Sequence, residues 1–264
     1  MATVSAGQSR ALAVRQLRFW LVNYRRTWQG SIYSSVLSPV LYLGAMGLGL
    51  GKLVDQHGTV SLGGSYLAFL APGLLAAGAM QTAIGETTYP ILASTKWLKT
   101  YHAAIASPLR PVDLFRGHLL FCAARLVMNS TVFLIVMAAF GAVKSAWVIA
   151  SLPAAVLTGL AFAAPIEAYA VTRDKDGSFA LMFRFGVMPL FLFSGTFFPV
   201  TSLPAVVRPL AYVTPLWHGV ALCRSLSLGT AQLLPSIGHA CYLAALIVIG
   251  VYVGSLTYRR KLYA

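Results

Sequence analysis

The stretch that decides the fold is residues 236–257, SIGHACYLAALIVIGVYVGSLT, which contains no Lys, Arg, Asp or Glu. A helix needs about 20 mostly apolar residues to cross the hydrocarbon core of a bilayer. Arg259, Arg260 and Lys261 follow directly, and blocks of basic residues beside a span mark the cytoplasmic side of a membrane protein. This stretch therefore predicts a membrane-spanning helix whose carboxyl-terminal end lies in the cytoplasm.

The composition of the whole chain supports the same class of protein. Of the 264 residues, 58% are hydrophobic and only 10% are charged, whereas soluble domains carry about 25% charged residues. The net charge is +14, but the basic residues lie in short blocks between apolar runs rather than on one face, which argues against nucleic-acid binding. We therefore expect an all-α integral membrane protein that forms a single transmembrane domain over residues 1–264.

Five more apolar stretches are long enough to span the membrane. The predicted spans are 31–51, 66–90, 117–140, 146–171, 179–199 and 236–257. Most Lys and Arg residues fall before the first span, in 91–116, in 172–178 and in the tail, which predicts that both termini are cytoplasmic. The few basic residues expected on the outer side are Lys52, Lys144, Arg208 and Arg224. With both termini inside, the number of spans must be even, and six satisfies this.

Three connecting segments have their own patterns. Residues 9–28 interleave Arg with apolar residues, which predicts an amphipathic helix along the cytoplasmic membrane surface; its interface residues are Arg15, Arg18, Trp20, Arg25 and Arg26. Residues 94–113 predict a short cytoplasmic helix before Pro108 and Pro111. Residues 200–233 are apolar but broken by three prolines, so we expect short re-entrant helices at the outer face.

The sequence contains no motif for catalysis, cofactor binding or metal binding. Residues 47–53, GLGLGKL, resemble a phosphate loop, but the spacing of the glycines is wrong and Leu53 replaces the required Ser or Thr. The three cysteines are far apart and fit neither a disulfide framework nor a metal site. We expect no catalytic residue, no metal and no cofactor bound by this chain.

Four ionisable residues fall inside predicted spans, namely Glu86, Arg125, Glu167 and Arg184. Such residues are costly in lipid and mark partners or pathways. Side chains lean toward the amino-terminal end of their helix, so the two Arg lean toward the cytoplasm, where they can snorkel, and the two Glu lean toward the bilayer centre. We expect each Glu to pair with an Arg or to face a water-filled cavity. A locking ion pair, a direct role in substrate binding or gating, and a neutral Glu all remain open.

Several motifs together resemble those of type-2 ATP-binding cassette (ABC) transporter permeases. The most specific are Tyr66-Leu67-Ala68-Phe69-Leu70-Ala71-Pro72-Gly73, Lys96-Trp97-Leu98-Lys99-Thr100-Tyr101, Ser107-Pro108-Leu109, Arg116-Gly117-His118, Phe197-Phe198-Pro199 and Tyr212-Val213-Thr214-Pro215-Leu216. The chain looks most like the nodulation-protein-J and daunorubicin-resistance branch. The resemblance covers nearly the whole chain and is specific to the family rather than to a substrate.

The resemblance implies partners and a mechanism. Two such permeases, identical or paralogous, would associate in a bacterial plasma (inner) membrane with two ABC ATPase chains, which bind ATP and Mg. ATP binding would close the ATPase pair and open a seam between the permeases. The residues expected at the ATPase contact are Lys96, Trp97, Leu98, Lys99 and Tyr101. Trp97 and Tyr101 would share one helical face; interfacial anchoring is the alternative explanation for these residues.

The leading functional interpretation is the permease subunit of an exporter of an amphiphile, such as a lipooligosaccharide, a glycolipid or a hydrophobic drug. A proton-coupled secondary transporter that uses Glu86 and Glu167 is the first alternative, but no inverted repeat is evident. A membrane enzyme that acts on lipids is the second alternative. It would need a polar cluster, and the five histidines, His57, His102, His118, His218 and His239, are scattered along the chain.

Overall fold

The computed structural model describes residues 6–51, 53 and 65–263, and every regular element in them is helical. Lys52 and His57, which the sequence singles out, lie outside these residues. The first half of the chain contains α1 (Ala6–Tyr42), α3 (Tyr66–Thr87), α4 (Tyr89–Leu92), α5 (Thr100–Ile105) and α6 (Pro111–Ala139). The second half contains α7 (Ser151–Ala170), α8 (Gly177–Met182), α9 (Met188–Phe193), α10 (Arg208–Val213), α11 (Pro215–Leu228) and α12 (Leu233–Tyr263).

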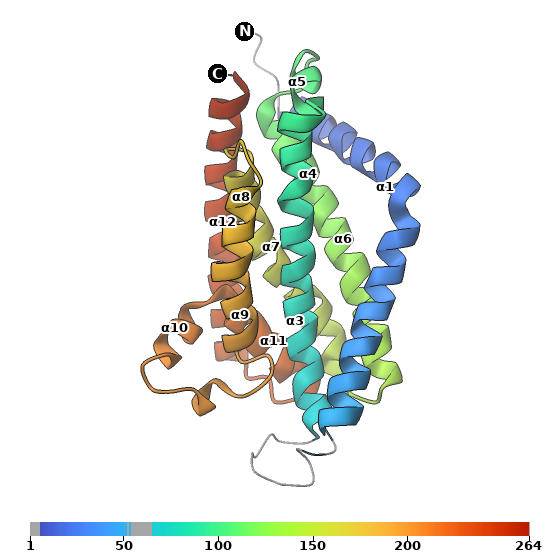
Figure 1. The fold of residues 1–264 in the computed structure, drawn as a ribbon, viewed down its shortest axis with the longest axis vertical. Coiled ribbons are helices and arrows are strands. Elements are labelled where there is room, and N and C mark those ends of the chain that lie inside the picture. The colour runs from blue at the N-terminus through green and yellow to red at the C-terminus, as the bar shows by residue number, and fades with distance from the viewer. Residues whose placement is uncertain (1–5, 52, 54–64, 264) are drawn as a thin grey trace.

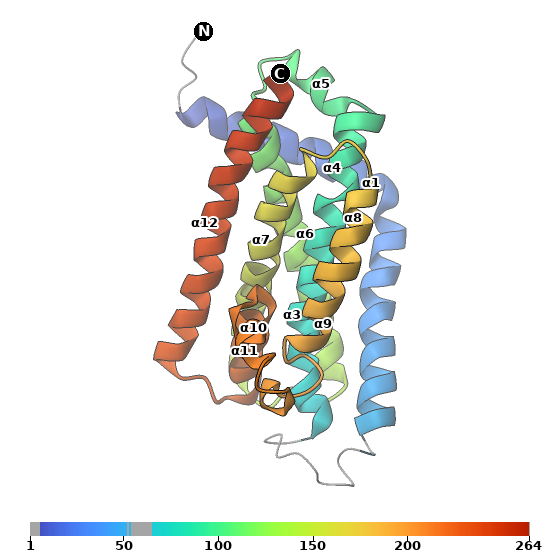
Figure 2. The ribbon, with the colours of Figure 1, turned by 60° about the vertical axis from the view of Figure 1, so that its left-hand side comes forward.

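The long helices run side by side in one bundle (Figure 1). The first half of α1 lies across one end of the bundle, and its second half runs along α6 (Figures 1 and 2). This end also holds α5 and the end of α12, and we call it the α5 end. The opposite end holds α10 and α11 and is called the α10 end. Helix α7 is central, because it packs against α3, α6, α11 and α12.

Within the described residues, four helices are long and apolar enough to cross a membrane: Tyr66–Trp97, Pro111–Ala139, Ala146–Ala170 and Leu233–Tyr263. They contain the predicted second and sixth spans, and they contain the third and fourth spans except for the last residue of each. The predicted first span falls in the second half of α1 and the π-helical stretch Leu43–Leu50 that follows it. The predicted fifth span corresponds to Gly177–Phe193, a shorter apolar helix. A crossing count of six therefore stays a prediction.

Several helix boundaries differ from the predicted ones, and two of them have clear local reasons. The second span does not end at Pro90, because a proline at the start of a helix costs no hydrogen bond. The chain breaks only at Thr88, and α4 and a π-helical stretch continue to Trp97. The fifth span ends at Phe193 instead of Pro199, since Gly195 adopts a φ of 83°, a conformation that stops a helix.

The segment 94–113 is also divided differently from the expected cytoplasmic helix. Lys96 and Trp97 belong to the last turn of the long second helix, and Lys99 takes a left-handed conformation with a φ of 52°. The separate helix is α5, which begins at Thr100. Trp97 and Tyr101 therefore lie on different helices, and the prediction that they share one helical face was wrong.

Candidate functional site

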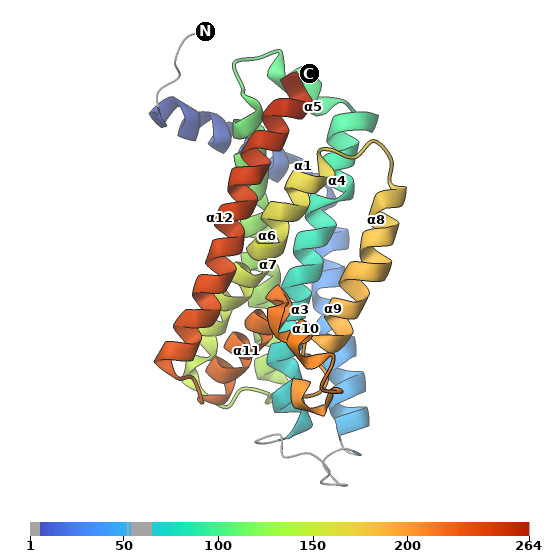
Figure 3. The same cartoon turned by 90° about the vertical axis from the view of Figure 1, so that its left-hand side faces the viewer.

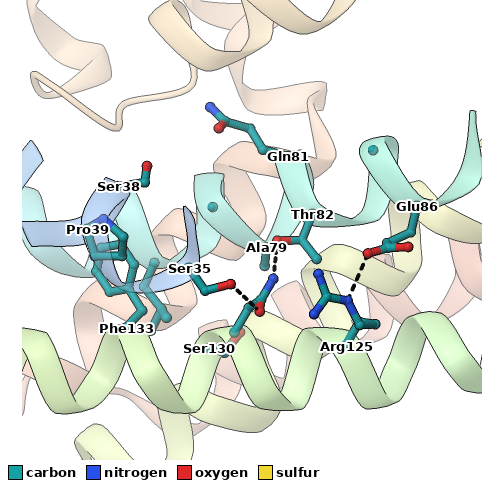
Figure 4. Close-up of a pocket in the computed structure, with 14 residues that line it drawn as sticks. Ser35, Ser38, Pro39, Ala79, Gln81, Thr82, Glu86, Arg125, Ser130 and Phe133 are labelled. Carbon is teal, nitrogen blue, oxygen red and sulfur yellow. Dashed lines mark hydrogen bonds and ion pairs between the residues drawn. The ribbon is translucent and has the colours of Figure 1, made fainter. Parts of the chain in front are cut away.

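A polar cavity lies between α1, α3 and α6. Its volume is about 380 Å³, and polar side chains from all three helices line it (Figure 4). The spacing of these residues explains why they meet: Thr82 and Glu86 are four residues apart on α3, as are Arg125 and Asn129 on α6. Side chains at this spacing lie on the same face of a helix. The two helices thus turn their polar faces toward one another.

An ion pair forms part of the cavity wall. Arg125 Nε donates to Glu86 Oε1 at 2.8 Å, and the two side chains are 9% and 21% exposed. The guanidinium of Arg125 also donates to the hydroxyl of Tyr24 and lies 4.3 Å from the centre of its ring. The structure therefore joins Glu86 to Arg125, one of the pairings considered from the sequence, and adds Tyr24 of α1 as a third partner.

Hydrogen bonds between neutral side chains extend from this ion pair. Ser35 Oγ donates to Asn129 Oδ1 at 2.9 Å, and Asn129 Nδ2 donates to Thr82 Oγ1 at 3.1 Å (Figure 4). Two further lining residues, Ser38 and Gln81, are exposed and have no hydrogen-bond partner in the part of the chain that the structure describes. The cavity therefore has an internally bonded wall and a rim with free donors and acceptors.

Glu167 has a different set of partners from the expected one. Its Oε1 accepts a hydrogen bond from Tyr258 at 3.0 Å, and its Oε2 lies 3.2 Å from His118 Nδ1. All three side chains are fully buried. Glu167 was expected to pair with an Arg or to face a water-filled cavity; in the described part of the chain it does neither, because it is fully buried and contacts His118 and Tyr258. Arg184 is exposed and forms no ion pair among the described residues.

Sequence reasoning missed three partners of the buried charges, Tyr24, Tyr258 and His118. His118 was interpreted as one of several isolated histidines. It lies seven residues before Arg125 on α6, so a helical projection would have placed both on the same face. The ring of Trp20 lies 4.5 Å from the His118 ring and stacks on Phe121. Trp20 is thus buried against the bundle, and its place on a membrane-surface helix stays a prediction.

The other predicted interface residues, Arg15, Arg18, Arg25 and Arg26, are exposed. They belong to the part of α1 that crosses the α5 end of the bundle (Figure 2). The predicted amphipathic helix is therefore continuous with the first predicted span rather than a separate element. Its place on a membrane surface stays a prediction.

The five residues predicted at the ATPase contact separate into groups. Trp97, Leu98 and Lys99 are exposed at the α5 end, with exposed fractions of 59% for Trp97 and 71% for Leu98. Tyr101 is buried and lies beside Tyr258, so its side chain is not available to a partner. Lys96 forms an ion pair with Asp174, with 2.6 Å between Lys96 Nζ and Asp174 Oδ1. Three of the five residues thus form an exposed cluster, here called the Trp97 cluster.

Asp174 connects three segments at this end. Besides Lys96, it contacts Lys261 of α12 at 3.2 Å. Hydrogen bonds from Lys96 and then Lys261, together with the two positive charges, lower the pKa of the Asp174 carboxyl below its ordinary value. The short 171–176 connection is therefore tied both to the segment that carries the Trp97 cluster and to the end of α12.

Two histidines meet near the α10 end. The Nδ1 atoms of His218 and His239 lie 2.8 Å apart, and Tyr242 stacks on the His218 ring. This pair joins α11 to α12. No group of three or more metal-binding side chains occurs in residues 6–51, 53 and 65–263.

Comparison with known proteins gives the family of this helical bundle. Residues 7–228 match the family described as "ABC-2 type transporter". The chain belongs to the ABC-2 type transporter family. It is a membrane permease, since the family comprises the transmembrane components of transporters, which are generally non-catalytic.

The curated relatives of this ABC-2 permease place it in the branch of the nodulation J proteins. Nodulation protein J from Rhizobium leguminosarum bv. viciae is 32% identical over 267 residues and covers 99% of this chain and 98% of its own. The protein of the same name from Rhizobium leguminosarum bv. trifolii is 30% identical and covers 92% of this chain and 94% of its own. The permease therefore matches these relatives along nearly their whole length.

Proposed function

We propose that this permease is the membrane subunit of an ATP-driven exporter that moves an amphiphile from the cytoplasm or the inner leaflet to the outside. Candidate substrates are lipooligosaccharides, glycolipids and hydrophobic drugs. A separate ATPase chain supplies the nucleotide and Mg, two copies of it act with two permeases, identical or paralogous, and the assembly lies in the bacterial plasma membrane.

The observation that carries this proposal is the Trp97 cluster. Trp97 and Leu98 are large apolar side chains that stay exposed beside Lys99 at the α5 end, where many of the basic residues gather. Exposed aromatic residues next to cations are typical of protein contacts. Because basic residues favour the cytoplasmic side, the α5 end would face an ATPase in the cytoplasm.

The long helix Tyr66–Trp97 could transmit a motion of the ATPase to the cavity. Residues 66–97 form one rod, broken only at Thr88, that carries the Trp97 cluster at one end and Gln81 and Glu86 of the cavity wall along its length. A displacement of Trp97 by the ATPase would therefore move one wall of the cavity. Such coupling needs contacts that differ between the nucleotide states of the ATPase.

Reconstitution in proteoliposomes tests the proposal. We expect no ATP hydrolysis by the permease alone, and export of a labelled amphiphile only when an ABC ATPase with its phosphate loop and ATP are both present. Trp97→Ala with Leu98→Ala should weaken co-purification of the ATPase. Trp147→Ala is the matched control, because Trp147 is similarly exposed but lies in the short helix Ala146–Ala150, in the connection before α7.

Two results would contradict the proposal. Unchanged association of the Trp97→Ala, Leu98→Ala variant would remove the assigned contact and favour interfacial anchoring of these residues. Export driven by a proton gradient without ATP would favour the alternative function, a proton-coupled transporter that uses Glu86 and Glu167. In that case Glu86→Gln and Glu167→Gln should each abolish the proton dependence.

A further inference from the structure

A groove separate from the polar cavity lies where α1, α6, α7 and α12 meet, and we call it the α12 groove. Its volume is about 510 Å³. Apolar side chains from all four helices line it, including Val14, Leu119, Leu120, Leu160, Ile247 and Val251. Val14 and Leu120 are 48% and 46% exposed. The groove is therefore open to the surroundings of the bundle, which for a membrane protein are lipid.

Two glycines fix the sides of the α12 groove. A Cβ atom on Gly117 of α6 would lie 2.7 Å from the carbonyl oxygen of Ala13 on α1. A Cβ atom on Gly254 of α12 would lie 2.5 Å from the ring of Phe115 on α6. Small residues of this kind let membrane helices approach closely. Helices α1 and α12 thus both pack directly on the first two turns of α6 and form opposite sides of the groove.

One charged side chain, that of Arg116, lines the α12 groove. Arg116 is exposed and has no ion-pair partner in residues 6–51, 53 and 65–263. The acidic residue nearest to it in the sequence, Asp113, is bound by Arg110. No Asp or Glu lines the groove. The groove therefore combines an apolar wall with a free guanidinium and no carboxylate to neutralise it.

These features fit an amphiphile with an acyl chain and a negative headgroup. An acyl chain gains dispersion energy against the apolar wall, and a guanidinium binds a phosphate through two parallel hydrogen bonds. Arg18, which is exposed, lies four residues after Val14 and so on the same face of α1. It adds positive charge beside the groove. The ammonium group of a zwitterionic headgroup would be repelled by these two cations and would find no carboxylate among the lining residues.

We propose that the α12 groove binds phosphatidylglycerol from the leaflet on the α5 side, with the phosphate on Arg116 and one acyl chain along Leu120 and Val251. The bound lipid contacts α1, α6 and α12 at once, so it fastens the first half of α1 to the bundle. The groove and the polar cavity share no lining residue. The inference therefore concerns a lipid bound to the permease and does not depend on what the permease exports.

Lipid binding to the purified permease tests this site without an ATPase. The permease is delipidated in detergent, titrated with phosphatidylglycerol or with phosphatidylcholine of the same acyl chains, and analysed by native mass spectrometry. One phosphatidylglycerol should bind about tenfold more tightly than phosphatidylcholine, because only its headgroup lacks the repelled ammonium. Phosphatidylglycerol should also raise the melting temperature more than phosphatidylcholine does, since a ligand of the folded state stabilises it.

Two variants and two matched controls locate the bound lipid. Arg116→Gln should weaken binding of phosphatidylglycerol about tenfold and leave that of phosphatidylcholine unchanged. Leu120→Trp should fill the groove and weaken binding although the guanidinium is kept. Arg25→Gln removes an exposed charge of α1 outside the groove, and Ile135→Trp adds the same ring at an exposed position of α6 outside it. Both controls should bind phosphatidylglycerol as the unchanged protein does.

Several results would overturn the site. Equal affinity for the two lipids would mean that the groove does not recognise the headgroup. Equal weakening by Arg116→Gln and Arg25→Gln would mean that the lipid responds only to the total charge of this end. Unchanged binding in Leu120→Trp would place the lipid elsewhere. A permease dimer that binds no phosphatidylglycerol and that Leu120→Trp dissociates would show that a second copy of the chain covers the groove. Equal elution profiles of the variants on size-exclusion chromatography establish that they are folded.

Discussion

Arg125 joins three helices at the cavity through charged and polar contacts. It binds Glu86 of α3 and Tyr24 of α1 while belonging to α6. An unpaired charge near the centre of a membrane helix costs about 2.5–3.5 kcal/mol on insertion scales. Loss of Arg125 would leave the Glu86 carboxylate unpaired and would incur this cost. Neither charge is tolerated alone, so the contacts of Arg125 with Glu86 and Tyr24 hold α1, α3 and α6 together.

We predict that Arg125→Ala lowers thermal stability strongly, by on the order of 3 kcal/mol. Arg184→Ala should change stability little, because Arg184 is exposed. Glu86→Gln added to Arg125→Ala should recover part of the loss by removing the orphaned carboxylate. Glu167→Gln added to Arg125→Ala should not, since Glu167 contacts Tyr258 and His118 instead.

Thermal unfolding of the purified variants in one detergent measures these differences. Equal stability of Arg125→Ala with and without Glu86→Gln would mean that the ion pair does not stabilise the bundle. A double variant that is stable but inactive in export would assign a transport role to the carboxylate.

At the scale of elements, the bundle depends on close contacts between helices. A Cβ atom on Gly250 of α12 would lie 2.7 Å from the backbone nitrogen of Pro165 on α7, closer than such atoms approach in practice. Small residues allow membrane helices to approach closely and gain dispersion energy. Gly250 therefore fixes the distance between α7 and α12 at this crossing.

We predict that Gly250→Ala destabilises the bundle by about 1–3 kcal/mol, the usual cost of overpacking. Gly238→Ala is the control on the same helix, because a Cβ atom added there would have no neighbouring atom within 4 Å; it should be neutral or slightly stabilising, since Ala favours helix by up to about 1 kcal/mol over Gly. The melting temperatures of the Gly250→Ala and Gly238→Ala variants, compared with that of the unchanged protein, test this prediction. Equal destabilisation by both would contradict the close contact at Gly250.

The link through Asp174 is the second feature at this scale. Its pKa is lowered, so the carboxylate bridge is complete above the ordinary value of 3.8 and is lost as pH falls through the lowered pKa. Asp174→Asn should remove the bridge at neutral pH and raise amide hydrogen exchange in residues 96–105.

Two controls accompany the Asp174 prediction. Asp176→Asn should leave exchange unchanged, because Asp176 is exposed and has no ion-pair partner among the residues described. Salt of about 1 M should imitate Asp174→Asn by screening the charges. Unchanged exchange in Asp174→Asn would mean that the connection is held by packing alone.

At the scale of the whole molecule, both ends of the bundle differ in charge and shape. The beginning of α1, α5 and the end of α12 lie together, and the short helices α10 and α11 lie at the other end (Figure 3). Helix Gly177–Phe193 is shorter than the four long helices; its 17 residues span about 26 Å at the rise of a helix. This helix length is close to the hydrocarbon thickness of a bilayer, which is about 30 Å.

We predict six crossings with the α5 end in the cytoplasm. In a variant without native cysteines, an impermeant thiol reagent applied from outside should label a cysteine at Ser202 or Thr230, which are both exposed near the α10 end. A cysteine at Leu98 should react only from the cytoplasmic side. Labelling of Ser202→Cys and Thr230→Cys from opposite sides would reveal an additional crossing, and labelling of Leu98→Cys from outside would reverse the orientation.

Part of the fold followed from local sequence signals. Four of the predicted spans lie, to within one residue, inside helices that are long and apolar enough to cross a membrane, because an apolar run of that length has few other stable forms. The helix ends were predicted less well. Pro90 was expected to end a helix and instead lies at the start of α4, and the end at Phe193 depends on the conformation of Gly195.

The sequence by itself determined that this protein is a helical membrane protein and which segments carry its charge. Only the tertiary structure decided which polar residues meet: Glu86 with Arg125, Glu167 with Tyr258 and His118, and Ser35 with Asn129. The physical reason is that lipid and the protein core are equally apolar, so hydrophobicity does not tell which face of such a helix packs inward. These partners lie tens of residues apart and meet only through the rotation and packing of whole helices.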